Sequence, residues 1–259
     1  MSENGKPGRA AWKAIALPAE HGSWGLTLEP ILAGMLTLPS WPGLLFSVAA
    51  FAAFLLRWPL RSYLLARRQE RKRLAWQFSA GYGMVSLLAL LGTVWLGGWT
   101  PLVPLLIAIP FGLVFVYYDW RRVGRTWQAE LAAPIAFAGV VAVILLLGGA
   151  EVGQAYAFWL ALAGRSAPSI FYVRARLNLD KERGAMVWPV HSLHLLALIL
   201  VLAVRLAGYL SWATVVILSL LLLRSLWGLS PWRLAVSVPR IGVAEMVWGF
   251  LLVLALAYG

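Results

Sequence analysis

An acid, an imidazole and a hydroxyl group occur together just before the first long apolar run of the chain. Residues 17–25 include Glu20, His21 and Ser23, and the apolar run that follows contains Glu29. An imidazole titrates near neutral pH, so His21 is a candidate general base, or a general acid when protonated, with Glu20 or Glu29 tuning it. We therefore take Glu20, His21 and Glu29 as the candidate catalytic residues.

Other ionisable residues lie within or at the edge of apolar runs, at a similar predicted depth. They are Glu29, Glu130, Arg165, His191, His194 and Glu245. A rise of about 1.5 Å per helical residue puts most of them roughly 5–12 Å below one membrane surface. Such groups normally face the interior of a bundle and mark a functional site. They could be helix-locking pairs, such as Arg165 with Glu29 or Glu245, but their shared depth favours one cavity that opens to the cytoplasm.

Metal and cofactor signals are weak. His191 and His194 lie on one helix face and could hold a metal or haem, although such a residue more often hydrogen-bonds to a neighbouring helix. Asp180 and Glu182 are interleaved with cations, which weakens a divalent-metal site. We predict no metal site, and the sequence leaves the cofactor unknown. It shows no nucleotide-binding loop and no zinc-protease or serine-hydrolase motif.

The composition indicates a multi-pass membrane protein. The chain has 259 residues, 61% of them hydrophobic and only 12% charged, whereas a soluble domain has about a quarter charged. Apolar stretches long enough to cross a bilayer predict an all-α bundle of about nine transmembrane helices. The predicted spans are 24–38, 42–58, 75–97, 101–118, 128–147, 154–173, 190–208, 211–229 and 239–258. The absence of cysteine excludes disulfides, thiolate metal sites and a cysteine nucleophile.

The net charge of +12 comes mainly from Lys and Arg residues in particular loops. We therefore expect membrane lipid as the partner of these residues rather than nucleic acid. All but Arg165 and Arg205 of the 22 Lys and Arg residues fall on the N-terminal segment and on alternate loops. The positive-inside rule then predicts a bacterial cytoplasmic-membrane protein with its N-terminus in the cytoplasm. We expect no signal peptide, a basic tail over residues 1–16 and a single transmembrane domain over residues 17–259. The run Arg67–Arg73 is expected to bind anionic lipid heads.

Several short motifs resemble the YwiC-like family of bacterial membrane proteins. The first is Pro18-Ala19-Glu20-His21-Gly22-Ser23-Trp24, followed by Pro30 and Gly34. The others are Arg57-Trp58-Pro59-Leu60, residues 125–133, Tyr172-Val173-Arg174-Ala175-Arg176 with Lys181-Glu182-Arg183, and the two histidines. The resemblance covers essentially the whole chain and implies a membrane protein without defining an activity.

A second group of features comprises nine spans, the orientation, polar loops after spans two and six, and Tyr117-Tyr118-Asp119-Trp120-Arg121-Arg122. Together these features resemble, more distantly, the UbiA superfamily of intramembrane prenyltransferases. In that superfamily, Asp-rich motifs after spans two and six hold Mg²⁺ on a prenyl diphosphate. In this chain, the segment after span two is Arg57-Trp58-Pro59-Leu60-Arg61, which contains no Asp. The segment after span six, residues 176–182, is only partly acidic.

Arginines in place of carboxylates still favour an anion, because a guanidinium binds phosphate bidentately without a metal. We expect an anionic amphiphile with its head among Arg57, Arg61, Arg174 and Arg176, with Tyr118 and Arg122 closing the mouth and the tail between helices. The candidate substrate-binding residues are Arg57, Arg61, Tyr118, Arg122, Arg165, Arg174, Arg176, Asp180, Glu182, His191, His194 and Glu245.

Three functions remain open. The first is an intramembrane transferase of isoprenoid or lipid substrates. The second is a transporter of a small anion or lipid, although the sequence has no internal repeat. The third is a non-catalytic component of a membrane complex that holds haem or quinone through His191 or His194.

Overall fold

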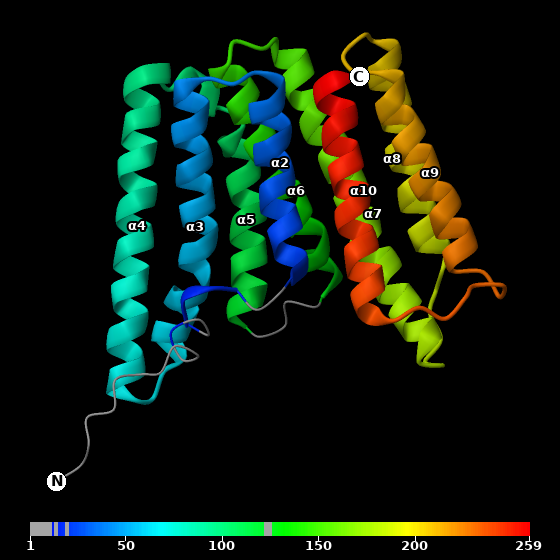
Figure 1. Cartoon of the computed structure of the whole chain (residues 1–259), viewed down its shortest axis with the longest axis horizontal. Helices are drawn as coiled ribbons and strands as arrows, with labels where there is room; N and C mark the ends of the chain where they lie inside the picture. The colour runs from blue at the N-terminus through cyan, green and yellow to red at the C-terminus, as the bar shows by residue number, and fades with distance from the viewer. Residues whose placement is uncertain (1–11, 13–14, 19–20, 122–125) are drawn as a thin grey trace.

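The computed structural model describes residues 12, 15–18, 21–121 and 126–259, with the backbone alone for residues 21–23. Over these ranges the chain forms nine α-helices, one short 3-10 helix and no strand, so the predicted all-α class is confirmed. The α-helices, labelled as in Figure 1, are α2 (His21–Thr37), α3 (Trp41–Leu65), α4 (Gln69–Gly97), α5 (Leu105–Trp120), α6 (Trp127–Leu147), α7 (Val152–Asp180), α8 (Trp188–Leu206), α9 (Trp212–Gly228) and α10 (Val238–Tyr258). The 3-10 helix, η1 (Thr100–Leu102), precedes α5.

Each predicted span falls on one of these helices, but three helices are longer than predicted. Helix α3 continues to Leu65, α4 begins at Gln69, and α7 continues to Asp180. The added segments are rich in Arg, Leu, Gln and Glu, which are good helix formers. The helices therefore continue beyond the apolar runs that define a span.

Short turns in the gaps between the predicted spans separate successive helices. Ser40 caps α3 by accepting a 3.1 Å hydrogen bond from the backbone N–H of Gly43, and Ser211 caps α9 through Thr214. Gly98, at the end of α4, and Gly208, after α8, have φ values of 75° and 91°. Only glycine adopts this backbone region at little cost, so these residues end the helices sharply.

Helices α6 and α7 form the centre of the bundle. Helix α6 packs against α2, α3, α5 and α7, and α7 packs also against α8, α9 and α10. Val141, Ala142 and Val143 of α6 are fully buried, as are Ala155 and Ala161 of α7. Figure 1 shows the α3–α4 pair at one edge of the bundle and the α8–α9 pair at the other. The residues at the centre therefore come from the middle of the chain.

Six of the described helices are long and apolar enough to cross a membrane, namely α3, α4, α5 with η1, α6, α8 and α10. Helices α2 and α9 are shorter, with 17 residues each, and α7 carries charged residues along its 29-residue length. Large apolar side chains such as Trp95, 87% exposed, and Leu106, 73% exposed, lie on the outside of the bundle. These features identify a multi-pass membrane protein.

One end of the bundle carries most of its cations, and we call it the basic end. Helices α3, α5, α7 and α9 end there, and α4, α6, α8 and α10 begin there. It includes Arg67, Arg121, Arg183 and Arg240, whereas Arg205 lies in the last turn of α8 at the opposite end. Of the predicted basic tail, Ile15 is buried against Leu74 and Ala75 of α4.

The orientation can be tested by labelling, because the natural chain has no cysteine. Lys181 is exposed at the basic end, and Glu151 is exposed at the opposite end. We expect a membrane-impermeant maleimide to label the Glu151→Cys variant in intact spheroplasts and the Lys181→Cys variant only after permeabilisation. The reverse result would invert the orientation, and labelling of both variants in intact spheroplasts would contradict the spanning topology.

Candidate functional site

A buried arginine in the middle of α7 connects three helices. Arg165 is 5% exposed, and its Nη1 donates to both carboxylate oxygens of Glu29 on α2, each at 2.9 Å. Its Nη2 donates to the backbone carbonyl of Glu245 on α10 and lies 3.8 Å from Oε2 of the same residue. Charges inside a membrane bundle are stable only when they are paired in this way.

A second arginine extends this arrangement to a fourth helix. Arg224 of α9 donates through Nη1 to Oε1 of Glu245 and through Nη2 to Ser169 Oγ at 3.4 Å. Its guanidinium also lies 4.2 Å from the ring centroid of Tyr172, a cation–π distance. Glu29, Arg165, Arg224 and Glu245 therefore form one ion network with two acids and two bases, which we call the membrane ion network.

Two glycines provide space for this network. A Cβ at Gly249 of α10 would overlap the carboxylate of Glu29 and would lie 3.1 Å from Nη2 of Arg165. A Cβ at Gly25, one turn before Glu29, would lie 3.1 Å from Oε1 of Glu29. The absence of a side chain at Gly249 is what lets α10 approach the ion pair.

The two predicted histidines lie on α8 and make different contacts. His191 Nδ1 is 2.9 Å from Ser225 Oγ on α9, next to Arg224. His194 is buried, and its Nδ1 lies 2.9 Å from the backbone carbonyl of Val190. Over the described ranges, no three or more His, Asp or Glu residues are grouped as a metal site. His191 therefore connects α8 to the helix that carries Arg224.

The arginines expected around one anionic head lie in three separate ion pairs. Arg61 bonds Asp119 of α5 at 3.0 Å, and Arg57 lies 3.9 Å from the other oxygen of that carboxylate. Arg174 bonds Glu130 of α6 at 2.8 Å. These contacts distribute the arginines along the basic end of the bundle instead of gathering them at one point.

Arg176 forms the third pair and holds a loop. It is 5% exposed and bonds Asp180 at 3.0 Å, and it also donates to the backbone carbonyls of Gly228 and Leu234. Asp180 accepts a second bond, at 3.1 Å, from Arg233. Arg176 thus fixes the segment between α9 and α10, and Asp180 is held between two arginines.

The remaining candidate residues are only partly described. Glu20 and Arg122 lie outside the described residues, and only the backbone of His21, at the start of α2, is described. Both carboxylate oxygens of Glu29 bind Arg165. Tyr118 is partly buried on α5 beside Tyr117, and Glu182 is exposed after α7. The structure therefore brings together Glu29, Arg165 and Glu245 from the predicted set, while the side-chain geometry of the Glu20–His21 pair stays a prediction.

Two residues of these ion pairs are not among the residues that the sequence predicts for the site. The charge distribution predicts Arg224 as a loop cation, but it lies inside α9 and completes the membrane ion network. Asp119 lies within a sequence motif that assigns it no role, and it is the partner of both Arg61 and Arg57. Asp119 is the only acidic residue between Glu70 and Glu130 in the sequence, and this isolation is the signal that points to it.

Helix α7 has two chemically distinct faces. With 3.6 residues per turn, one face carries Arg165, Ser169, Tyr172 and Arg176, and the opposite face carries Leu160, Ala163, Gly164, Ala167 and Arg174. The first face contacts the membrane ion network and the loop after α9. The second face forms the floor of an apolar groove.

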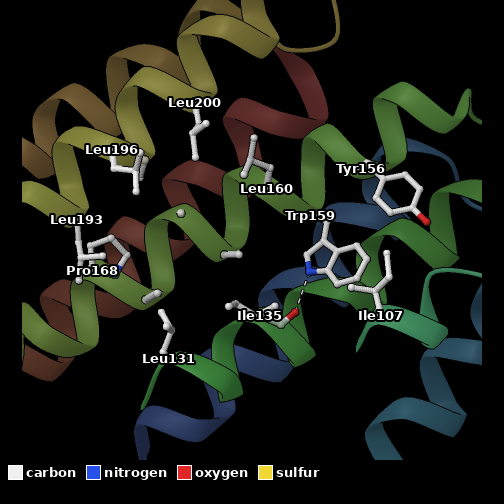
Figure 2. A pocket seen from close by; sticks show the side chains of 14 residues that line it. Ile107, Leu131, Ile135, Tyr156, Trp159, Leu160, Pro168, Leu193, Leu196 and Leu200 are labelled. Atoms are coloured by element: carbon white, nitrogen blue, oxygen red, sulfur yellow. Dashed lines mark hydrogen bonds between the residues drawn. The ribbon is translucent and has the colours of Figure 1, made fainter. Parts of the chain in front are cut away.

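This groove lies between α6 and α8 and has a volume of about 490 Å³. Figure 2 shows Leu193, Leu196 and Leu200 of α8 along one side and Leu131 and Ile135 of α6 along the other. At the end nearer α5, the indole N–H of Trp159 donates to the backbone carbonyl of Ile135 at 2.7 Å. The only polar group of the indole is therefore satisfied, and the lining is almost entirely apolar.

A second depression, of about 700 Å³, lies at the basic end where α3 turns into α4. Its lining includes the arginines Arg61, Arg67, Arg68 and Arg71 together with Trp58 and Leu74. The two concave sites share no lining residue. One suits an apolar chain, and the other suits an anion.

The close approach at Gly249 gives a direct test of the membrane ion network. In Gly249→Ala, breaking a buried ion pair costs about 3–5 kcal/mol, offset by about 1 kcal/mol of helix propensity. We therefore expect the free energy of unfolding in mixed SDS and detergent micelles to fall by roughly 2–4 kcal/mol. Gly242→Ala on the same helix is the matched control, because a Cβ there meets nothing within 4 Å.

A second substitution separates the network from general packing. In the Glu29→Ala background the carboxylate that a Cβ at residue 249 would meet is gone, so Gly249→Ala should cost far less than it does in the natural chain. Equal costs in the two backgrounds, or equal effects of Gly249→Ala and Gly242→Ala, would contradict the arrangement described above.

Comparison with known proteins assigns the family. The pattern of the YwiC-like protein family matches residues 17–145, a range that contains α2 to α5, most of α6 and the first motif of the sequence resemblance. No protein of curated function and no solved structure matches the chain, so the UbiA resemblance stays a prediction, as does the part of the YwiC-like resemblance beyond residue 145. With its apolar membrane-spanning helices and this family match, the chain is a YwiC-like membrane protein.

Proposed function

We propose that this protein binds an anionic amphiphile, with the apolar tail in the groove between α6 and α8 and the head at Arg174. The observation that carries the proposal is the stripe on α7, which runs from Leu160 through Gly164 and Ala167 to Arg174. The same helix face that floors the groove therefore ends in a cation at the basic end.

The dimensions of the groove suit an extended apolar chain. From Tyr156 to Pro168 the lining advances 12 positions along α7, or about 18 Å at a rise of 1.5 Å per residue. A volume near 490 Å³ lies within the range of ligand sites, about 300–1,000 Å³. Small residues on the floor, Ala163 and Gly164, leave the space that the leucines on both sides enclose.

Arg174 is placed to interact with a headgroup. Its side chain is 49% exposed, and it bonds Glu130, whose side chain is 13% exposed. Exposed ion pairs contribute only about 0–1 kcal/mol, so an anionic head can share the guanidinium at little cost. Glu130 directly precedes Leu131, which lines the groove, so the pair is one residue away from the lining along α6.

Two functions are compatible with a bound amphiphile, a transferase and a transporter, and they differ in what happens to the amphiphile after it binds. In a transferase of the kind that the UbiA resemblance implies, the amphiphile is the substrate, and His21 with Glu20 supplies the proton transfer. A transporter of an anion or lipid is the second candidate. The membrane ion network favours it, because ion pairs joining α2, α7, α9 and α10 can exchange partners when helices move.

The proposal is tested by blocking the groove and by neutralising the head site. In Ala163→Phe the ring fills the floor of the groove, and Arg174→Gln removes the charge. We expect the amount of amphiphile that co-purifies with the protein, measured by native mass spectrometry and by solvent extraction, to fall roughly tenfold in each variant, equivalent to about 1.4 kcal/mol.

Matched controls separate binding from general damage. Ala213→Phe places the same ring on an exposed position of α9, and Arg183→Gln removes the same charge from an exposed loop position. Both controls should retain the amphiphile at the level of the natural chain. Equal retention in all four variants would overturn the proposal, as would equal loss in a variant and its control.

A further inference from the structure

We infer that the depression between α3 and α4 is a binding site for a phosphate group. Its guanidinium groups come from Arg61 near the end of α3 and from Arg67, Arg68 and Arg71 around the start of α4, and Glu70 is the only acidic residue among the described residues that line it. Four arginines against one carboxylate give the described part of the lining a net charge of +3. This site shares no residue with the α6–α8 groove, so the inference does not rest on the proposed function.

Within the described part of the chain, most of this positive charge is not neutralised by a carboxylate. Over the described ranges, Arg67, Arg68 and Arg71 form no ion pair, and only Arg61 bonds a carboxylate, that of Asp119. Arg67, Arg68 and Arg71 are all exposed. Guanidinium groups bind phosphate oxygens bidentately, so several in one depression suit an anion that offers three or four oxygens.

The backbone adds to this attraction. Helix α4 begins at Gln69, and Arg68 precedes it without a side-chain cap. The first N–H groups of a helix have no partner within the helix and carry the positive end of its dipole. A 29-residue helix that begins at the edge of an arginine-lined depression therefore presents donors and a favourable dipole to a phosphate.

The apolar part of the lining extends the range of suitable ligands. Ile15, Trp58, Leu65 and Leu74 line the same depression, and Ile15 and Leu74 are buried. A phosphate attached to an apolar body, such as a phospholipid headgroup, suits this surface, and so does a free phosphate or diphosphate. The chemistry common to these ligands is the phosphate anion.

The experiment measures phosphate binding to the purified full-length protein in neutral detergent, with two probes. Native mass spectrometry measures retention of added phosphatidylglycerol against phosphatidylcholine. Thermal unfolding with and without inorganic pyrophosphate measures binding of a soluble phosphate. We expect the triple variant Arg67→Gln/Arg68→Gln/Arg71→Gln to retain at least about tenfold less phosphatidylglycerol and to lose any stabilisation by pyrophosphate.

Two further variants keep the result specific. The triple variant Arg121→Gln/Arg183→Gln/Arg240→Gln removes the same charge from exposed arginines outside the depression and should bind both probes as the natural chain does. Glu70→Gln removes the one opposing carboxylate and should raise retention about twofold or more. This gain cannot arise from a folding defect.

The two probes identify the source of the phosphate. Selective binding of phosphatidylglycerol without an effect of pyrophosphate supports a lipid headgroup, and displacement of the lipid by pyrophosphate supports a site open to soluble phosphates. Equal losses in the two triple variants would show a general surface-charge effect and overturn the inference. Binding of neither probe by the natural chain would overturn it as well.

Discussion

The arrangement of this bundle depends on the burial of one guanidinium group. Removing Arg165 from water without partners would be prohibitive, and breaking such a pair once it is buried costs about 3–5 kcal/mol. Glu29 and Glu245 must therefore lie beside it, which places α2 and α10 against the middle of α7. Arg224 then balances the second carboxylate and places α9. Helices α2, α7, α9 and α10 are thus oriented by a network whose charges sum to zero.

Helix α7 has a polar face and an apolar face, so one helix both forms the ion pairs and floors the groove. The face with Arg165, Ser169 and Tyr172 meets the ion pairs and the ring contact of Arg224. The opposite face has small apolar residues, and α6 and α8 stand apart over it to leave the groove. Averaged along the sequence, α7 therefore looks less apolar than its neighbours, although it lies at the centre of the bundle. Two of its charged side chains, Arg165 and Arg176, are buried inside the protein.

The sequence predicts the helices well, because apolar run lengths and Gly or Pro turns depend on local physics. It also indicates which buried charges share a depth, and Glu29, Arg165 and Glu245 do meet. It does not place the arginines of the basic end. Arg61 and Arg176 have long side chains whose partners, Asp119 and the loop carbonyls after α9, come from helices that only the tertiary fold brings near. The depth of a charged residue in the membrane follows from counting residues along its helix, whereas the side of the bundle on which it lies depends on how the helices pack.

Charge balance at the basic end explains why anions are the expected ligands. Asp119, Glu130 and Asp180 each accept a bond from an arginine, so these carboxylates are already committed to cations of the protein. Lys and Arg nevertheless outnumber Asp and Glu by 22 to 10 over the whole chain. The surplus must be balanced by anions from outside the protein, and beside a membrane those anions are chiefly lipid headgroups and phosphates. Carboxylates would have favoured a divalent cation as the bridge to a phosphate. Arginines in their place remove that requirement, because they contact the phosphate themselves.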